Sequence, residues 1–396
     1  MSDDVDLHSM TELLQALVRI PSRADEDDLD RVCLFVENWF RERRVSVRVL
    51  KAVSGERLGV YAEAVGKAGV GPWTVLDATL DTAGFGDLST WTFEPTRAEI
   101  DAEGWLHGRG SADSKAAVSV FSHLLLELLA RPDFAGRVGV LFDCDEHSGR
   151  FGGAHAFFDE AHGEDGPPRP DGVFIGYPGI DRIVHGCRGF LRSRITVHGI
   201  AAHSGSSRHR GVNAISRALE LARRLETIPL PPATEEFPLP PQSTITGVQG
   251  GAQSFSQVPD LCEISLDVRL TPSFSLAAAR QAIEETVAAF DAGSAQTEGT
   301  GIEWHGGWPA YQVPATHPLV RSLREASREE LGVDVPTAVV GPSNIGNYLA
   351  SLGVPALCGF GVRAEGIHAA NERVALDSID PVYRVYRNAL RRLHRS

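Results

Sequence analysis

The chain has 396 residues, of which 42% are hydrophobic and 23% charged, and its formal net charge is −14. This composition is that of a folded protein and excludes a disordered or fibrous chain. The excess of acid, with no Lys/Arg cluster, argues against binding to nucleic acid or to anionic membranes, so we expect small-molecule partners. The N-terminal MSDDVDLHSM lacks the basic and apolar parts of a signal peptide, and no apolar run reaches about 18 residues, which predicts a cytoplasmic protein.

The first part of the chain predicts an α/β arrangement. Two amphipathic helices, near residues 13–18 and 32–40, precede the strands LGVYAEAV, TVLDATL and VGVLFDC. A helix that starts near Ser111 and carries VSVFSHLLLELLA separates the last two strands. The order of strand, helix and strand predicts a βαβ unit in a parallel sheet. A further strand, GVFIGY, ends at Tyr177.

The middle of the chain predicts a second domain. Six elements follow in the order β-α-β-β-α-β: RSRITVHGI, NAISRALELARRLETI, STITGVQGG, LCEISLDVRLTP, LAAARQAIEETVAAFDAG and GIEWHGG. This order is that of a ferredoxin-like α+β domain, here at residues 189–306. Helices and strands alternate again after it. We therefore predict a discontinuous α/β domain, residues 1–188 and 307–396, whose mostly parallel sheet is flanked by helices, with the α+β domain inserted into it; two units also suit a chain longer than about 250–300 residues.

Polar residues that follow the predicted strands mark a candidate site, because ligands bind beyond the carboxyl ends of parallel strands. These residues are Asp81, Asp145, Glu146, His147, Tyr177, His368 and Glu372, and Asp113 joins them from the start of a helix. Carboxylate and imidazole groups suit a zinc ion, and a neighbouring carboxylate can activate water. Each residue by itself has an ordinary explanation as a helix cap, a solvated acid or a surface histidine. Their coincidence at strand ends favours a site.

The chain resembles the zinc aminoacylase/carboxypeptidase family of M20 type, which includes acetylornithine deacetylase and succinyl-diaminopimelate desuccinylase. The resemblance is carried by GRGSADSKAA, DEHSG, VHGIAAHSG with GVNAI, and IHAANERV, which occur in one order. It covers nearly the whole chain. It implies a centre built for two zinc ions and an inserted domain that serves as lid and as homodimer interface.

Part of the family's set of site residues is present. By this resemblance Asp113 matches the aspartate that bridges the two zinc ions, Glu146 the general base and His368 a late metal ligand. His147 stands where the family has a metal-binding glutamate. Asp81 matches the aspartate of an HxD motif and is expected to orient a ligand.

Two ligands that the resemblance implies are replaced. Thr79 occupies the position of the histidine in the HxD motif, and Tyr177 occupies the position of a further acidic ligand. In the family both positions bind the same zinc ion of the pair. The other zinc keeps a set of Asp113, His147 and His368, which is chemically reasonable for one metal ion. A metal-free centre is the alternative. Tyr177 is then either a hydrogen-bond or proton donor, or a filler of the vacated space.

The inserted domain contributes three candidate residues through the same resemblance. His203 matches a histidine that stabilises the oxyanion in the partner subunit's site. Asn213 and Arg269 match lid residues that support the structure or bind the substrate carboxylate. Ser256 replaces a nearby family asparagine, which puts that substrate contact in doubt.

Three functions follow as hypotheses. The first is an amidohydrolase of M20 type that acts on an N-acyl amino acid or a small peptide-like amide, with at most one metal ion per site. The second is a metal-independent enzyme of specialised metabolism, a cyclase, lyase or acyl transferase, that uses Glu146, His147 and Tyr177. The third is a non-catalytic binding protein with the same fold.

Overall fold

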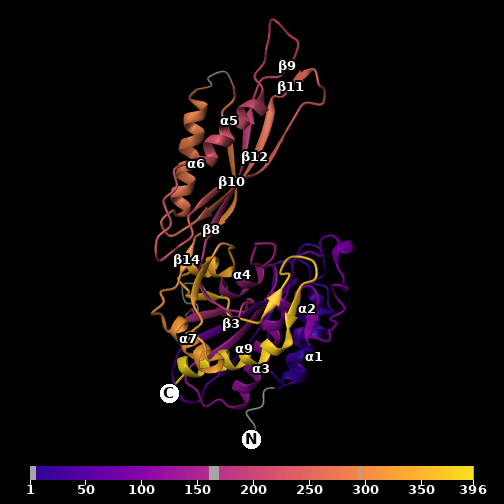
Figure 1. Ribbon diagram of the computed structural model, residues 1–396, viewed down its shortest axis with the longest axis vertical. Coiled ribbons are helices and arrows are strands. Elements are labelled where there is room, and N and C mark those ends of the chain that lie inside the picture. The colour runs from indigo at the N-terminus through magenta and orange to yellow at the C-terminus, as the bar shows by residue number, and fades with distance from the viewer. Residues whose placement is uncertain (1–5, 160–168, 294–296, 396) are drawn as a thin grey trace. The chain divides into compact units, whose positions relative to one another are not determined.

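The computed structural model describes residues 6–159, 169–293 and 297–395 (Figure 1). The chain divides into two compact units, one made of residues 1–185, 313–338 and 344–396, the other of residues 186–312 and 339–343. The sequence predicts the second unit at 189–306. The short segment 339–343 joins it because Arg188 donates its backbone N–H to Val340 and accepts a hydrogen bond from the Ser343 hydroxyl. Local sequence pattern does not reveal a contact across some 150 residues.

The first unit contains a six-stranded sheet. Its strands, in spatial order, are β1 (Arg48–Lys51), β2 (Arg57–Val65), β5 (Arg137–Asp143), β3 (Trp73–Thr79), β6 (Gly172–Ile175) and β16 (Ala356–Cys358). The last four run parallel to one another, while β1 and β2 are antiparallel additions at one edge. The predicted α/β class with a mostly parallel sheet is confirmed. Every residue of β3 is buried, as expected for a central strand covered on both faces.

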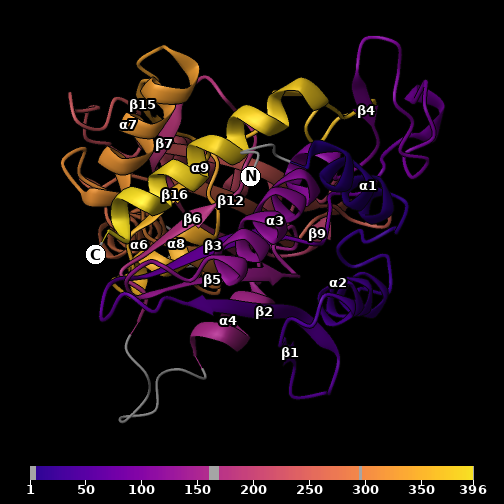
Figure 2. The same ribbon diagram turned by 90° about the horizontal axis from the view of Figure 1, so that it is seen from below.

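Helices cover both faces of this sheet, as Figure 2 shows. The helices α1 (Leu7–Val18), α3 (Ala116–Ala130) and α9 (Ile379–Leu393) lie on one face, and α4 (Gly152–Phe158) lies on the other. Aromatic side chains join the first layer: Tyr386 of α9 packs edge-on against Phe121 of α3 and Phe174 of β6, with ring centroids 5.0 and 5.7 Å apart. The remaining helices of this unit are α2 (Asp30–Glu42), α7 (Pro318–Leu331) and α8 (Ile345–Ser351).

The helix α3 begins later than the sequence predicts. The prediction places its start near Ser111, whereas regular helix begins at Ala116 and is preceded by an irregular turn, Ser111–Lys115. Within that turn Asp113 has φ −117° and ψ 88°, which is not helical. The backbone N–H groups of Ala112 and Asp113 donate to the carboxylate of Glu372. The carboxylate of Glu372, which is distant in sequence, thus accepts from backbone N–H groups that were expected to belong to the first turn of the helix. Asp113 is therefore not the residue that caps α3.

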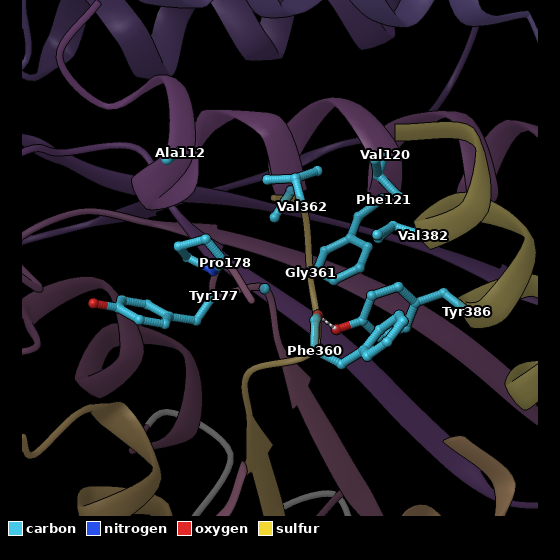
Figure 3. A pocket seen from close by; sticks show the side chains of 12 residues that line it. Ala112, Val120, Phe121, Tyr177, Pro178, Phe360, Gly361, Val362, Val382 and Tyr386 are labelled. Atoms are coloured by element: carbon cyan, nitrogen blue, oxygen red, sulfur yellow. Dashed lines mark hydrogen bonds between the residues drawn. The ribbon is translucent and has the colours of Figure 1, made fainter. Parts of the chain in front are cut away.

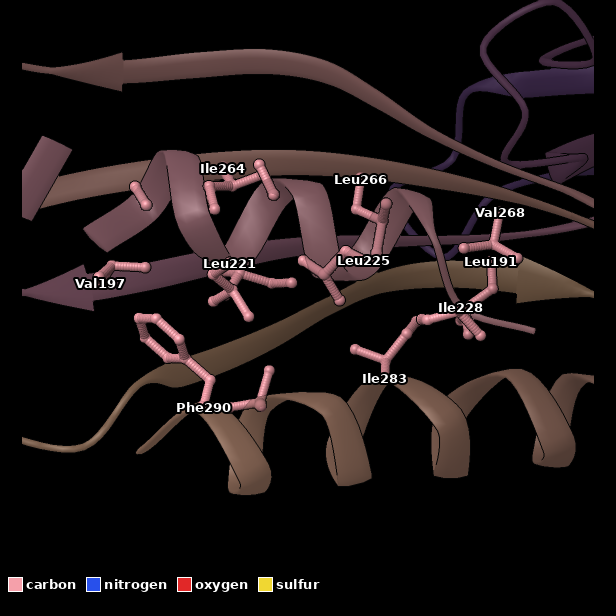
Figure 4. Packing of buried hydrophobic residues seen from close by; sticks show 14 of the residues in the cluster. Leu191, Val197, Leu221, Leu225, Ile228, Ile264, Leu266, Val268, Ile283 and Phe290 are labelled. Atoms are coloured by element: carbon pink, nitrogen blue, oxygen red, sulfur yellow. The ribbon is translucent and has the colours of Figure 1, made fainter. Parts of the chain in front are cut away.

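The second unit has the predicted β-α-β-β-α-β order. Its elements are β8 (Gly189–His198), α5 (Ala214–Glu226), β10 (Gln242–Gly250), β12 (Leu261–Leu270), α6 (Leu276–Asp291) and β13 (Gly301–Trp308). The strands form an antiparallel sheet in the order β10-β12-β8-β13. Side chains along β12 alternate between buried and partly exposed, so one face of the sheet is apolar. Leu221 and Leu225 of α5 and Ile283 and Phe290 of α6 pack with that face (Figure 4).

Several short strands are not predicted from the sequence, because most of them have only two or three residues and so carry no periodic pattern. They are β4 (Trp105–His107), β7 (Ile183–Cys187), β9 (Ala202–His203), β11 (Gln257–Val258), β14 (Tyr311–Gln312), β17 (Ala364–Glu365) and β18 (Arg373–Ala375). The strand β15 (Thr337–Val340) coincides with TAVVG, a strand of the alternating pattern predicted after residue 306. Pairing of β18 with β4 brings the loop 366–372 beside residues 108–115. Among the residues that the structure describes, no helix is both long and apolar enough to cross a membrane.

Candidate metal centre and active site

Three side chains from distant parts of the first unit converge on one point. Asp113 lies in the turn before α3, His147 in the loop after β5, and His368 in the loop between β17 and β18. The Oδ2 atom of Asp113 is 3.0 Å from Nε2 of His368 and 3.6 Å from Nε2 of His147. One ligand atom from each residue lies within 4.8 Å of the other two. The structure therefore brings together the three residues that the sequence predicts as metal ligands.

The spacing of this cluster fits a metal ion. Zinc bonds of about 2.0–2.1 Å in a tetrahedral arrangement place neighbouring ligand atoms about 3.3 Å apart. The two distances from Asp113 lie on either side of that value, at 3.0 and 3.6 Å. One carboxylate and two imidazole nitrogens form a donor set suited to zinc with an open position for water or substrate. These residues fit a single metal ion.

Electrostatic coupling within the cluster is strong. Burial opposes the ionisation of Asp113, but the hydrogen bonds and charges of His147 and His368 outweigh it and hold the pKa of Asp113 below its ordinary value. Burial also lowers the pKa of His147, yet Asp113 and Asp81 overcome this and raise that pKa well above the ordinary value. A protonated His147 thus neutralises the carboxylates around it, and a metal cation at the same place supplies equivalent positive charge.

Glu146 lies next to this cluster in a position suited to proton transfer. Its side chain is 24% exposed, and its Oε2 atom is 3.6 Å from Nδ1 of His147. Burial, together with the charges of Asp113 and Asp81, raises the pKa of Glu146 to about 7, while His147 and His368 oppose the rise. A carboxyl group with a pKa near neutrality can both accept and release a proton at physiological pH. Glu146 therefore has the properties of a general acid–base.

Asp81 supports the loop that carries these residues. Its carboxylate is fully buried and accepts hydrogen bonds from the Thr79 hydroxyl at 2.5 Å, the Glu146 N–H at 3.2 Å and the His147 N–H at 3.0 Å. Burial alone would raise the pKa of Asp81, but His147 and Thr79 stabilise the anion and lower it. Asp81 is thus an ionised anchor for the backbone at Glu146 and His147.

Arg109 and Glu372 hold the two loops of the centre together. Their side chains form a buried ion pair, Nη1 to Oε2, at 2.7 Å. Arg109 also donates to the backbone carbonyl of Ala369, and Glu372 accepts from the backbone of Ala112 and Asp113. These contacts connect the residues next to Asp113 with the loop of His368. The sequence places Glu372 after a predicted strand but does not reveal its pairing with Arg109, which lies in GRGS.

Two residues with hydroxyl groups, Thr79 and Tyr177, lie at the ends of the neighbouring strands β3 and β6. Thr79 is buried at the end of β3 and donates to Asp81. Tyr177 follows β6, and burial, reinforced by the charges of Asp113 and Glu146, raises its pKa. Tyr177 and Pro178 also line a small apolar pocket with residues of α3, α9 and the segment after β16. Figure 3 shows the Tyr177 ring turned away from Phe121 within that group. Tyr177 is therefore a neutral phenol that lies within the electrostatic reach of the centre.

Two buried carboxyl groups beneath Thr79 were also missed. Asp77 belongs to β3 and Asp143 to β5, and both have oxygens without a hydrogen-bond partner. Thr79 pairs with Asp143 in register, and Asp77 lies two residues earlier, so all three side chains point to the same face of the sheet. Burial raises the pKa of each aspartate well above its ordinary value. The signal was present as acids within the apolar strands WTVLDAT and RVGVLFD.

The three candidate residues of the inserted domain lie in the second unit. His203 is exposed on β9, and its Nδ1 accepts a hydrogen bond from the Gly205 N–H at 3.1 Å. Asn213 caps α5, because its side chain accepts from the second and third residues that follow. Arg269 on β12 forms an ion pair with Asp267 at 2.8 Å. The cap gives Asn213 a local structural role that the sequence allows.

The model of "Peptidase family M20/M25/M40" matches residues 75–392. The chain belongs to this peptidase family. Succinyl-diaminopimelate desuccinylase of Bordetella petrii is 26% identical over 390 residues, covering 96% of this chain and 97% of the relative. The enzyme of that name from Cupriavidus taiwanensis is 29% identical over 324 residues, covering 79% and 80%. The resemblance inferred from the motifs is confirmed at the level of the family, which is a family of hydrolases.

Solved structures agree on the fold. The M20-family metallo-carboxypeptidase Sso-CP2 from Sulfolobus solfataricus superposes with a TM-score of 0.79 at 17% identity and covers 99% of both chains. The YxeP protein of Bacillus subtilis, described as a dinuclear metal-binding peptidase, superposes with a TM-score of 0.69 at 16% identity and covers 97% of both chains. The two-unit architecture is thus that of known M20 structures.

Proposed function

We propose that this protein is a metal-dependent amidohydrolase that cleaves an N-acyl amino acid or a small peptide-like amide, with one zinc ion per active site. The observation that carries the proposal is the convergence of Asp113, His147 and His368 within 4.8 Å, next to Glu146. The relatives reported above are named as hydrolases, and they give no support to a cyclase, lyase or acyl transferase or to a non-catalytic role. The relatives named as desuccinylases make N-succinyl amino acids the first substrates to test.

The proposed mechanism assigns the metal ligands and the proton carrier to separate residues. Asp113, His147 and His368 would hold the zinc ion, which when bound polarises a carbonyl group and acidifies water. Glu146 takes a proton from the attacking water and delivers it to the nitrogen of the leaving amine, a cycle that its pKa of about 7 permits. The products are a carboxylic acid and a free amine. Asp81 keeps Glu146 in place through the backbone hydrogen bond at 3.2 Å.

Tyr177 supplies a second electrophilic group in this proposal. Its raised pKa keeps the phenol protonated at neutral pH, so it can donate a hydrogen bond to an oxygen that gains negative charge. The alternative role, a filler of space without contact to substrate, predicts that Tyr177→Phe is as active as the wild type.

The roles of the second unit rest on the family resemblance. We propose that His203 stabilises the oxyanion, that Arg269 binds the substrate carboxylate and that residues 189–306 form a homodimer interface. Multi-angle light scattering of the full chain tests the dimer, and the effect of Arg269→Leu on KM tests the carboxylate contact.

The decisive experiment combines metal analysis with turnover. Purified protein is expected to contain about one zinc ion per chain and to release amine from one member of a panel of N-succinyl, N-acetyl and dipeptide substrates. Glu146→Gln is expected to lose about 10²–10⁴-fold in kcat while retaining zinc, because it removes only the proton carrier. Glu325→Gln, at an exposed position of α7, is the matched control. Full activity after exhaustive removal of metal would refute the metal-dependent mechanism and favour the metal-free alternative.

A further inference from the structure

His147 has one ring nitrogen facing each of two carboxylates. Its Nε2 atom is 3.6 Å from Oδ2 of Asp113, and its Nδ1 atom is 3.5 Å from Oδ2 of Asp81. The side chain is only 5% exposed, so water has little access to the ring. Nδ1 is fully buried and makes no hydrogen bond to the described residues as the ring now stands. The ring therefore depends on these carboxylates to fix where its proton lies.

A metal ion at the cluster imposes one arrangement of that proton. Binding through Nε2 uses the lone pair of Nε2, so a neutral imidazole must carry its hydrogen on Nδ1. A hydrogen on Nδ1 needs an acceptor in this buried place. Histidines that bind metals commonly donate their other N–H to a carboxylate, which fixes the ring and its tautomer. Asp81 stands where such a carboxylate is needed.

Two carboxylates compete for this hydrogen, and their surroundings differ. The Oε2 atom of Glu146 lies at 3.6 Å from Nδ1, almost as close as Asp81. Glu146, however, is partly exposed, and within the described part of the chain its carboxylate accepts no hydrogen bond. Asp81 is fully buried and is held by three donors, one of which is the Thr79 hydroxyl. The fixed acceptor is Asp81, and Glu146 stays free for proton transfer.

We propose that Asp81 and Thr79 form a positioning unit that orients His147 as a metal ligand: Thr79 holds Asp81, and Asp81 accepts the Nδ1 hydrogen of His147. This inference rests on the proposed function, because it requires a metal ion at Asp113, His147 and His368. It gives Thr79 a defined role. Thr79 occupies the position at which the family has the histidine of the HxD motif. Its hydroxyl, 2.5 Å from Asp81, is the side-chain donor that holds this aspartate.

The test separates positioning from folding by changing the hydroxyl alone. Thr79→Val keeps the shape of the side chain but removes the donor, and Thr79→Ser restores it. Zinc affinity is measured by competition with a chromophoric chelator, and the geometry of the site by the absorption spectrum of the cobalt-substituted protein. We expect Thr79→Val and Asp81→Asn to weaken zinc binding about 10–100-fold, with a changed cobalt spectrum, and Thr79→Ser to bind within about 3-fold of wild type. Thr74→Val, at the opposite end of β3, is the matched control.

A double-mutant cycle shows whether Asp81 acts through His147. In a His147→Ala background, Asp81→Asn is expected to cause little further loss of zinc affinity, because the ring that it orients is absent. An equal loss with and without His147, or a Thr79→Val protein with unchanged affinity and spectrum, would overturn this proposal while leaving the proposed function in place. A wild-type protein that binds no zinc would overturn both. Thermal melting of every variant without metal identifies losses that come from unfolding.

Discussion

The two sides of the centre differ in the chemistry that they present. On one side Asp113, His147 and His368 offer a carboxylate and two imidazoles within 4.8 Å. At the ends of β3 and β6, where the resemblance assigns the ligands of a second ion, Thr79 and Tyr177 offer two hydroxyl groups, and the raised pKa of Tyr177 keeps its hydroxyl protonated. Neutral hydroxyl groups are weak ligands for zinc, whereas imidazole and carboxylate are strong ones. The comparison teaches that the two sets of positions diverged separately: the cluster of Asp113, His147 and His368 keeps side chains suited to a metal ion, whereas the two positions that the resemblance assigns to a second ion alone carry hydroxyl groups.

The largest expected effect is the loss of the side that binds metal. Asp113→Asn should reduce zinc affinity by more than the about 10–100-fold that supporting residues cause, because it removes a ligand itself. Activity should fall with it. Titration with zinc and assay at saturating metal measure the two effects. Asp171→Asn is the control, since Asp171 binds the Trp73 N–H at the opposite end of the sheet. Unchanged zinc affinity in Asp113→Asn would show that the zinc ion binds elsewhere.

The second prediction is designed to abolish the difference between the two sides. A Thr79→His, Tyr177→Asp double variant places an imidazole and a carboxylate at the positions that the resemblance assigns to the other metal ion. The zinc content should rise from about one to about two ions per chain, as measured by mass spectrometry of the metal. Thr79→Gln with Tyr177→Asn has similar volumes but weaker ligands and should stay near one. A double variant that also stays near one would mean that the backbone around Thr79 no longer fits a second ion.

The third prediction concerns the ion pair behind the metal-binding side. Arg109→Leu should lower the free energy of unfolding by about 3–5 kcal/mol, because it leaves the buried carboxylate of Glu372 without its partner. Chemical denaturation measures this. The control is Arg363→Leu, whose pair with Asp377 is exposed and should contribute less than about 1 kcal/mol. Similar small losses in both variants would show that the buried pair does not hold the two loops.

The last prediction concerns the pH dependence of stability that comes from the carboxyl groups beneath Thr79. Asp143 has a raised pKa, so the folded protein binds more protons than the unfolded chain, and stability falls as pH rises from the unfolded pKa toward the folded pKa. Asp143→Asn removes this titration and should gain up to about 1.4 kcal/mol over wild type for each pH unit in that window. Denaturation at pH 5, 6, 7 and 8 measures the slope. A gain that does not change with pH would show that Asp143 is already ionised, as a bound cation on the Thr79 side would require.

The strand-end rule predicted the members of the centre well, for a physical reason. The carboxyl ends of parallel strands lie at the same edge of the sheet. The residues that follow β3, β5 and β6 must therefore lie near one another. Asp81, Glu146, His147 and His368 were identified in this way, and Asp113 at the start of the next helix completed the set. Hydrophobic periodicity predicted the six elements of the second unit. Its alternating strands and amphipathic helices each have one apolar face, which must pack into the core.

Contacts between residues far apart in the sequence were decided only by the tertiary structure. Arg109 meets Glu372 across 263 residues, and His368 meets Asp113 across 255. The start of α3 moved to Ala116 because Glu372 binds the backbone in front of it. Local propensity contains no information about such partners, since their energy depends on where other segments of the chain pack.

The amino-acid sequence by itself determined the class of fold, the order of both units and the types of side chain available to the centre. Hydrophobic periodicity and residue identity are local properties, and both can be obtained from the sequence alone. Only the tertiary structure decided which nitrogen of His147 faces which carboxylate, because that choice depends on distances of 3.5 and 3.6 Å to Asp81 and Asp113. It also decided that Thr79 supports Asp81, since a hydrogen bond exists only once both groups are buried together.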